Sequence, residues 1–156
     1  MANYNYIKKR MSTMEGERQT WEDHWQTILD FVSPRANIHH SLNDGFSFIA
    51  YLDEDKIIGG AIFSHYDGHN IWIHLALDDP KAMRRSFAKE VFEYCFIKCK
   101  CVRITAMTTP ENERCKKLIE SAGFVKEGTI RKVIKKGMQY FDGIVYGLLR
   151  DECKYI

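Results

Sequence analysis

The fold is decided by residues 103–128, RITAMTTPENERCKKLIESAGFVKEG. The first five residues form a short run with β-branched and apolar members, which is typical of a strand. Four apolar residues then recur at helical spacing: Cys115, Leu118, Ile119 and Ala122. This spacing predicts a helix over 111–122 with one apolar face. Gly123 can adopt the left-handed conformation that ends a helix, so we expect another strand to open at Phe124.

The start of this helix carries its own signal. Thr109 is a good N-cap residue, Pro110 suits the first helical position, and Glu111 favours the positive end of the helix dipole. Residues 103–128 therefore predict a strand, a turn, a helix and a second strand in immediate succession.

The flanking sequence predicts a β-meander followed by a crossover. The expected elements are a strand over 4–9, a helix over 15–32 that Pro34 ends, a short helix or loop over 35–45, strands over 46–52, 56–65 and 69–77, a long helix from Asp79-Pro80, and a hairpin of 124–130 and 139–149. A strand, a long helix and a strand in this order imply a parallel βαβ pair. We therefore predict an α/β (α+β) fold, a mixed sheet of six or seven strands with helices on both faces. Gly59 and Gly60 in mid-strand predict a bulge or the close approach of another backbone or a ligand.

Composition places the chain among ordinary globular proteins. At 156 residues, with 45% hydrophobic and 28% charged residues, we expect one domain over 1–156. The net charge of +2 does not favour nucleic acid as a partner. No apolar run approaches the ~20 residues of a membrane span and no signal peptide opens the chain, so we expect a cytoplasmic protein with no membrane partner. The five dispersed cysteines predict free thiols and no metal site.

The region around the predicted helix resembles the acyl-CoA-binding region of the GNAT superfamily of N-acetyltransferases. The residues that fill the family pattern are Asn112, Cys115, Leu118, Ile119, Glu120, Gly123 and Phe124. The continuation is similar to the branch that acetylates N-terminal alanine amines of ribosomal proteins, through Glu127, Gly128, Arg131, Gly137, Asp142, Tyr146, Leu148 and Leu149. The chain also looks like small acetyltransferases encoded by phages. This resemblance implies a GNAT-like fold and acetyl-CoA (CoA) as the cofactor.

The resemblance also implies where the cofactor binds. The residues implied are Leu75 and Leu77 through their backbone, then Arg84, Arg85, Ser86 and Asn112. A basic helix start suits the CoA phosphates, although a basic turn that is merely solvated is the alternative. Ser86 and Ala88 occupy the two glycine positions of the family's phosphate loop, which predicts an altered loop because serine adopts positive φ less freely than glycine. For Asn112, the alternative is a helix-start role.

Acetyl transfer to an amine has three chemical requirements. The ammonium must lose a proton, the oxyanion needs a hydrogen-bond donor, and the leaving thiolate must gain a proton. His74 stands on the strand where many family members have a glutamate base, and histidine titrates near neutral pH; a structural histidine is the alternative. Ile119 fills the slot of the family's proton-donating tyrosine and cannot donate. Cys115 fills the serine slot of the N-terminal branch, where its thiol can face the sulfur or pack in the core. Weaker candidates are Glu111, Tyr140 and Asp142.

Two functions from different classes follow. The first is an acetyl-CoA-dependent N-acetyltransferase that transfers an acetyl group directly to a primary amine. A protein or peptide amine, such as a protein N-terminus, is the favoured acceptor, and a small-molecule amine is left open. The second is a catalytically inactive GNAT-like protein that binds a protein or RNA partner, which the missing loop glycines and Ile119 favour. A homodimer through the last strands is also left open.

Overall fold

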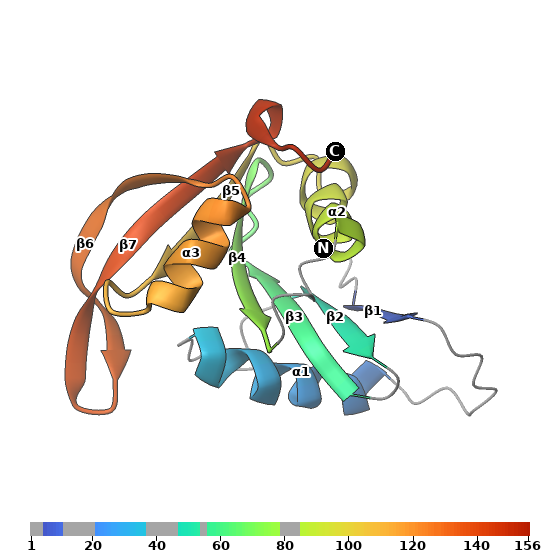
Figure 1. Cartoon of the computed structure of the whole chain (residues 1–156), viewed down its shortest axis with the longest axis horizontal. Helices are drawn as coiled ribbons and strands as arrows, with labels where there is room; N and C mark the ends of the chain where they lie inside the picture. Colours follow the sequence, from blue (N-terminus) through green and yellow to red (C-terminus); the bar gives the residue numbers. More distant parts are fainter. Residues whose placement is uncertain (1–4, 11–20, 37–46, 54–55, 79–84) are drawn as a thin grey trace.

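A computed structural model describes residues 5–10, 21–36, 47–53, 56–78 and 85–156 (Figure 1). The strands are β1 (Asn5–Arg10), β2 (Ser47–Asp53), β3 (Lys56–Ser64), β4 (Asn70–Leu77), β5 (Arg103–Thr108), β6 (Val125–Lys136) and β7 (Gln139–Leu149). The helices are α1 (Trp21–Ala36), α2 (Arg85–Glu93) with the π-helical turn η2 (Tyr94–Lys98), α3 (Glu113–Ser121) and the 3₁₀ turn η3 (Arg150–Glu152). The expected starts of the helices at residue 15 and at Asp79, and most of 35–45, lie outside the described residues.

The strands form one seven-stranded sheet in the order β1-β2-β3-β4-β5-β7-β6. β1 is parallel to β2, and β2, β3 and β4 form the predicted antiparallel meander. β4 is parallel to β5, as the crossover through α2 requires, and β7 lies between β5 and β6, antiparallel to both. The prediction of a mixed sheet is confirmed.

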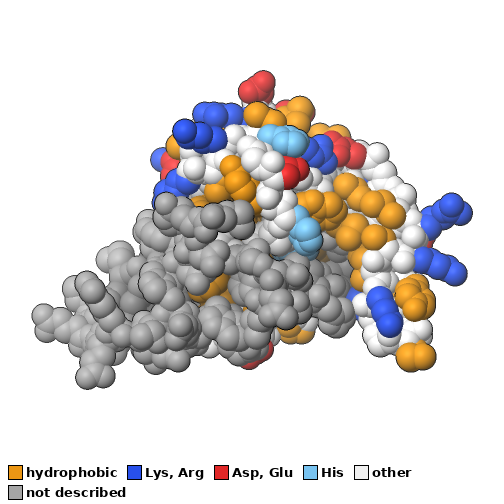
Figure 2. Space-filling model, turned by 180° about the vertical axis from the view of Figure 1, so that it is seen from behind, with side chains coloured by type: hydrophobic (Ala, Val, Ile, Leu, Met, Phe, Trp, Pro, Cys, Tyr) orange, Lys and Arg blue, Asp and Glu red, His pale blue; other side chains and the backbone are white. Residues whose placement is uncertain are grey.

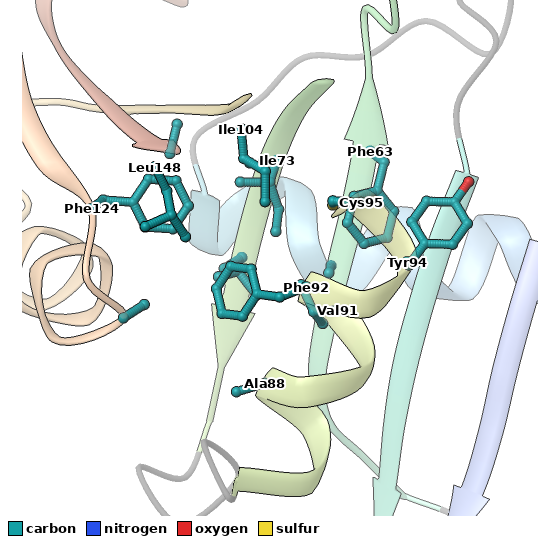
Figure 3. Packing of buried hydrophobic residues seen from close by; sticks show 14 of the residues in the cluster. Phe63, Ile73, Ala88, Val91, Phe92, Tyr94, Cys95, Ile104, Phe124 and Leu148 are labelled. Carbon is teal, nitrogen blue, oxygen red and sulfur yellow. The ribbon is translucent and has the colours of Figure 1, made fainter. Parts of the chain in front are cut away.

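Helices cover both faces of the sheet, as predicted. α1 packs on one face, where its apolar side chains join those of β2, β3 and β4. α2 and α3 cover the opposite face and contribute to a larger cluster with residues from β2 to β7. Figure 3 shows this larger cluster from the α2 side, with α1 behind the strands. The division into two faces matters for the site, because residues that alternate along β4 reach opposite sides of the molecule.

The helix α2 carries the buried stripe that its sequence predicts. Its buried members are Phe87, Ala88, Val91 and Phe92, followed by Cys95 in η2. Figure 3 shows Phe92 and Val91 turned toward the strands. Burying one such Val or Phe side chain stabilises a fold by about 1.5–3 kcal/mol, so this stripe fixes the crossover against the sheet. Cys99, expected as the last member, is only half-buried because η2 ends at Lys98.

Pro34 does not end α1, contrary to the prediction, and the helix continues to Ala36. Proline removes one helical N–H bond and crowds the carbonyl four residues earlier. Because Pro34 is exposed and lies in the last turn, this cost falls on a single carbonyl near the helix end. Arg35 stabilises the same turn by donating from Nη1 to the Phe31 carbonyl at 2.8 Å and by pairing with Asp78 at the end of β4.

The helix α3 begins two residues later than predicted, and Thr109 is not its N-cap. The cap is Asn112, whose side-chain oxygen accepts a hydrogen bond from the Cys115 N–H at 3.0 Å. Thr109 instead starts a turn, because its carbonyl accepts from the Asn112 N–H at 3.2 Å. The predicted helix end is confirmed, since Gly123 has a φ of +101°.

The β6–β7 hairpin is longer than the sequence predicts. β6 continues past Ile130 to Lys136, and the two strands project beyond the rest of the sheet (Figure 1). An irregularity between Ile130 and Ile134 interrupts the pairing. Within it, Lys132 has a positive φ of 51° and donates its N–H to the Asp142 carboxylate at 2.9 Å. This bulge gives Asp142 a structural role in the hairpin.

The bulge expected beside Gly59 and Gly60 is present, and the groups that approach the two glycines most closely are side chains rather than a backbone or a ligand. The register between β2 and β3 shifts beside them, so a bulge is present. A Cβ atom on Gly60 would lie 2.8 Å from Cγ2 of Val32 in α1, and one on Gly59 would lie 2.7 Å from Cδ2 of Leu77 in β4. Both distances are shorter than carbon atoms tolerate. The missing side chain of Gly60 therefore lets α1 sit close to the sheet, and that of Gly59 leaves room for the Leu77 side chain on the other face.

Gly60→Ala should therefore destabilise the protein by about 1–3 kcal/mol, since the added methyl overpacks the contact between β3 and α1. The measurement is the free energy of urea unfolding. Gly128→Ala in β6 is the matched control, because no atom lies within 4 Å of its Cβ position, and we expect a change within about 0.5 kcal/mol. Equal losses in the two variants would show that packing against α1 is not the cause.

Candidate active site

The main feature of the site is a gap between two neighbouring strands. β4 and β5 pair in parallel at three positions, from Asn70 with Arg103 to Trp72 with Thr105. Beyond these positions the two strands separate, although β4 continues to Leu77 and β5 to Thr108. A gap of this kind leaves one edge of each strand without a strand partner, so its backbone groups must find other partners.

The backbone of Leu75 and Leu77, the two residues expected to bind the cofactor through their main chain, faces this gap. The Asp78 N–H bonds the Ile58 carbonyl of β3 at 2.9 Å. Since the bonding direction alternates along an antiparallel strand, the N–H and C=O groups of Leu77 and Leu75 point the other way, toward the gap. The Leu77 carbonyl accepts a hydrogen bond from Nη2 of Arg114 in α3 at 2.7 Å. An arginine of α3 thus occupies one of the two backbone positions expected to bind the cofactor.

A cavity of about 490 Å³ lies between the end of β4 and α3. Its lining residues are Arg35, Leu75, Ala76, Leu77, Asn112, Arg114, Cys115, Lys117, Leu118 and Ser121. The cavity combines an apolar floor, the exposed edge of a strand, an amide and three cations. This donor set fits an elongated ligand with an amide-containing arm and anionic groups, which is the chemistry of CoA.

A second, much smaller cavity of about 10 Å³ is lined by residues from both faces of the sheet. Its lining includes His74 and Met107, which point to the α1 face, and Cys115, Ile119 and Phe124, which lie on the α3 face. Leu75 and Cys115 line both cavities. His74 and Cys115, the two predicted catalytic residues, therefore line this small cavity from opposite faces of the sheet. We call this small cavity the opening.

Cys115 is a partly exposed thiol in a largely apolar setting. Burial raises the pKa of this thiol above its ordinary value, and the nearby Thr108 hydroxyl lowers it by a smaller amount. Thr108 is itself 2% exposed, and its hydroxyl has no hydrogen-bond partner of ordinary geometry among the described residues. A thiol with a raised pKa stays protonated at neutral pH, so Cys115 is not poised to attack as a thiolate.

His74 is 9% exposed and lies in mid-strand on β4, paired in register with Ile62 of β3. Its backbone is thus fixed by the sheet while its ring reaches the small cavity. Ile119 in the helix is buried and lines the same cavity, as expected for the slot that cannot donate a proton.

Arg35, Asp78 and Arg114 form a charged clamp beside the large cavity. Arg35 of α1 bonds the Asp78 carboxylate through two nitrogens, at 2.7 and 3.1 Å. Arg114 of α3 donates to the carbonyls of Leu77 and Asp78 at 2.7 and 3.1 Å. The hydrogen bonds from Arg35 hold the pKa of Asp78 below its usual range, so this carboxylate remains charged between the two arginines. The clamp joins helices from both faces of the sheet to the end of β4.

The other predicted residues separate into two groups. Arg84 lies outside the described residues, and for Arg85 and Ser86 only the backbone is described, at the start of α2. Of the weaker candidates, Asp142 holds the hairpin bulge, Tyr140 lies exposed in the hairpin and Glu111 is exposed before α3.

Within the part of the chain that is described, no group of three His, Cys, Asp or Glu side chains could hold a metal, and no helix is long and apolar enough to cross a membrane.

Sequence reasoning missed four residues of the site: Arg35, Met107, Thr108 and Arg114. The periodicity of α3 puts Arg114 on the polar face, and no local signal says that its side chain reaches β4. Thr108 is a β-branched residue at the end of a strand, and its sequence context gives no sign of a role in the site. Only the separation of β4 from β5, which depends on packing between distant segments, gives these residues a role.

Comparison with known proteins agrees with this geometry. The family model of the acetyltransferase (GNAT) domain matches residues 4–145. The chain belongs to the GNAT acetyltransferase family. It is 30% identical over 104 residues to an uncharacterized N-acetyltransferase, YnaD, of Bacillus subtilis strain 168, covering 64% of this chain and 61% of the relative. It is 31% identical over 115 residues to YokL, an SPbeta prophage-derived uncharacterized N-acetyltransferase of the same organism, covering 70% and 64%.

A solved structure extends the likeness over most of the chain. The ribosomal-protein-S5-alanine acetyltransferase from Vibrio fischeri is 25% identical, with a TM-score of 0.61, and the match covers 90% of this chain and 80% of that one. The chain spans less than two thirds of the length of either Bacillus subtilis relative. The GNAT resemblance seen in the sequence, including its likeness to the ribosomal-protein branch and to phage acetyltransferases, is confirmed.

The cap of α3 leads to a stability prediction. Asn112→Ala should lower the free energy of unfolding by about 1 kcal/mol, because the Cys115 N–H loses its acceptor. Asn112→Asp keeps an acceptor oxygen at the positive end of the helix, so its stability should stay within about 0.5 kcal/mol of the wild type. Urea unfolding of both variants measures this difference. An Ala variant as stable as the wild type would contradict the capping role.

Proposed function

We propose that this protein is an acetyl-CoA-dependent N-acetyltransferase that transfers an acetyl group directly to a primary amine, with residues 1–156 acting as one catalytic domain. The observation that carries this proposal is the opening between β4 and β5, which has His74 on one face and Cys115 on the other. The large cavity on the α3 face is the donor side, and the α1 face is the acceptor side. Membership of the GNAT family supports this assignment.

Acetyl-CoA supplies an activated acetyl thioester. The edge of β4 at Leu75 binds the amide-containing arm like an added strand, and the amide of Asn112 donates to it from the start of α3. Arg114 lies where it competes for the Leu77 carbonyl, so donor binding requires this arginine to release that carbonyl or to bind beside it. Lys117 and Arg35 add positive charge around the same cavity. Arg85 and Ser86, at the start of α2, are proposed phosphate contacts.

The proposed chemistry assigns one proton transfer to each face of the sheet. His74 accepts the proton that the acceptor ammonium loses, and the amine nitrogen then bonds to the acetyl carbon. As the carbon–sulfur bond breaks, the nitrogen loses its second proton to solvent, the Cys115 thiol gives its proton to the leaving sulfur, and Cys115 regains a proton from solvent. An imidazole nitrogen can accept the first proton, and burial keeps the Cys115 thiol protonated.

The acceptor that we favour is the N-terminal amine of a protein. Support comes from the match to the Vibrio fischeri ribosomal-protein-S5-alanine acetyltransferase, which covers 90% of this chain. The alternative function is a GNAT-like binding protein without catalysis, for which Ile119 in the small cavity and the arginine on the Leu77 carbonyl are the favouring observations. The two functions differ in whether acetyl-CoA binds and whether any amine is acetylated.

Titration calorimetry with acetyl-CoA tests the donor site. We expect micromolar binding to the wild type and about tenfold weaker binding to Asn112→Asp, because this variant loses an amide donor and adds a negative charge beside an anionic ligand. Since Asn112→Asp keeps the helix cap, the loss cannot be assigned to unfolding. Absence of binding to the wild type at millimolar acetyl-CoA would overturn the enzyme proposal.

Single-residue variants test the two proton transfers. His74→Gln should lower kcat about 10²-fold, because no side chain then takes the proton of the acceptor ammonium. The rate should also rise with pH, because only the fraction of the amine that is already neutral in solution can react. Cys115→Ala should lower kcat about tenfold, while Cys115→Ser, which keeps a proton donor of similar size, should retain most of it. Initial rates with a peptide amine between pH 6 and about 9 measure both effects. A His74→Gln variant with wild-type kcat and pH profile would mean that His74 is structural.

A further inference from the structure

The positive charge of this protein is concentrated at the end of one hairpin. Residues 130–141, IRKVIKKGMQYF, contain four basic side chains and no acidic one. Since the whole chain carries +2, the remaining residues sum to −2. The basic residues are Arg131, Lys132, Lys135 and Lys136. Figure 2 shows Lys and Arg side chains gathered with hydrophobic ones at the projecting end of the molecule. This segment, which we call the hairpin tip, therefore carries an excess of positive charge.

The hairpin tip also exposes apolar side chains that the fold does not use. Met138 is 92% exposed and Tyr140 is 57% exposed, and Ile130 and Val133 are each close to half exposed. Lys135 lies over the Tyr140 ring, with its ammonium 5.9 Å from the ring centre. Exposed methionine and aliphatic residues interleaved with cations are more typical of a contact surface than of a solvated turn.

The backbone of the hairpin offers a further means of contact. β6 is the outermost strand of the sheet, and among the described strands only β7 pairs with it. An open edge of this kind can accept an added strand through main-chain hydrogen bonds. The bulge at Lys132 divides this edge into two segments, each of which pairs with β7, one near the turn and one beside the rest of the sheet.

We propose that the hairpin tip is a docking surface for an acidic, partly apolar segment of a protein partner. The four cations would pair with its carboxylates, and Ile130, Val133 and Met138 would contact its apolar side chains. A second copy of this chain is a poor occupant, because two hairpin tips would each bring a charge of +4 to the contact. A nucleic acid is disfavoured as well, because its negative charge continues beyond the tip toward a remainder of the protein that is net negative.

This inference deepens the proposed function, on which its catalytic consequence rests. If the acceptor is a protein N-terminus, an acidic segment of the same acceptor would bind the hairpin tip while its amine enters the opening at His74. Docking of this kind selects a protein acceptor over a small amine without adding any group to the catalytic site. It acts on the affinity and association rate of the acceptor, since complementary surface charges mainly steer encounter.

The test uses fluorescence anisotropy with a labelled acidic peptide of about 15 residues that contains Asp, Glu, Leu and Phe, long enough to follow β6. Arg131→Glu with Lys135→Glu reverses two charges of the tip, and Met138→Ser removes an apolar contact that the folded chain does not use. Lys98→Glu with Arg150→Glu is the matched control, because it makes the same change in net charge after α2 and after β7, away from the tip (Figure 1).

We expect the double charge reversal to weaken peptide binding about tenfold at low salt, Met138→Ser to weaken it severalfold, and the control to stay within about twofold. Wild-type affinity should fall as salt rises. Equal losses in the tip and control variants would overturn the proposal. So would tighter binding of a single-stranded RNA of matching length, or a dimer in sedimentation that the tip variants dissociate.

Failure of docking and failure of the enzyme proposal can be told apart. Peptide binding is read without any acetyl transfer, so binding in a protein that acetylates no amine would leave the docking surface standing and reject the enzyme. Docking alone would be rejected by two results together. The protein would acetylate a short peptide, and the wild type and the tip variant would have equal kcat/KM on an acceptor that carries an acidic segment. If both proposals hold, the tip variant should lose kcat/KM about tenfold on that acceptor and none on the short peptide.

Discussion

The separation of β4 from β5 after three paired positions is the constraint on which the rest of the structure depends. A strand edge inside a protein cannot leave its N–H and C=O groups without partners, so something must lie across it. Here α3 does so, with Arg114 donating to the carbonyl of Leu77 and Ile119 filling the gap from one face. The same separation creates the cavity and the opening. Fold stability and the candidate site therefore arise from one feature.

Many residues that carry the family resemblance hold α3 and the last hairpin in place. Glu120 of α3 accepts a hydrogen bond from the Tyr146 hydroxyl of β7 at 3.1 Å, and burial raises the pKa of Tyr146 to about 12, so it remains a donor at neutral pH. Arg103 of β5 bonds the Glu127 carboxylate of β6 across Gly147, whose missing side chain leaves room for the pair. These contacts join α3, β5, β6 and β7, so the motif encodes the frame around the opening as well as its lining.

The parts of this structure that the sequence predicts are those governed by local pattern. The meander, the buried stripe of α2 and the end of α3 at Gly123 follow from alternation, helical spacing and the conformational freedom of glycine. The errors have tertiary causes. Pro34 stays within α1 because Arg35 anchors the last turn to Asp78, and the cap of α3 moves to Asn112 because Thr109 is used in a turn. Which residues meet at the opening depends on where two strands diverge, and no short pattern records that.

The opening also explains how two weak candidates become a coherent pair. In sequence, a single histidine in an apolar strand and a single cysteine on an apolar helix face each have an ordinary structural explanation. In the structure the sheet separates them, with His74 on the α1 side and Cys115 on the α3 side of the same small cavity. In the proposed reaction the amine loses its proton on one side, and the leaving sulfur gains a proton on the other. In this proposal the base and the acid reach the same cavity from opposite faces of the sheet, so donor and acceptor would bind on different faces. The proposed acid is a thiol that burial keeps protonated.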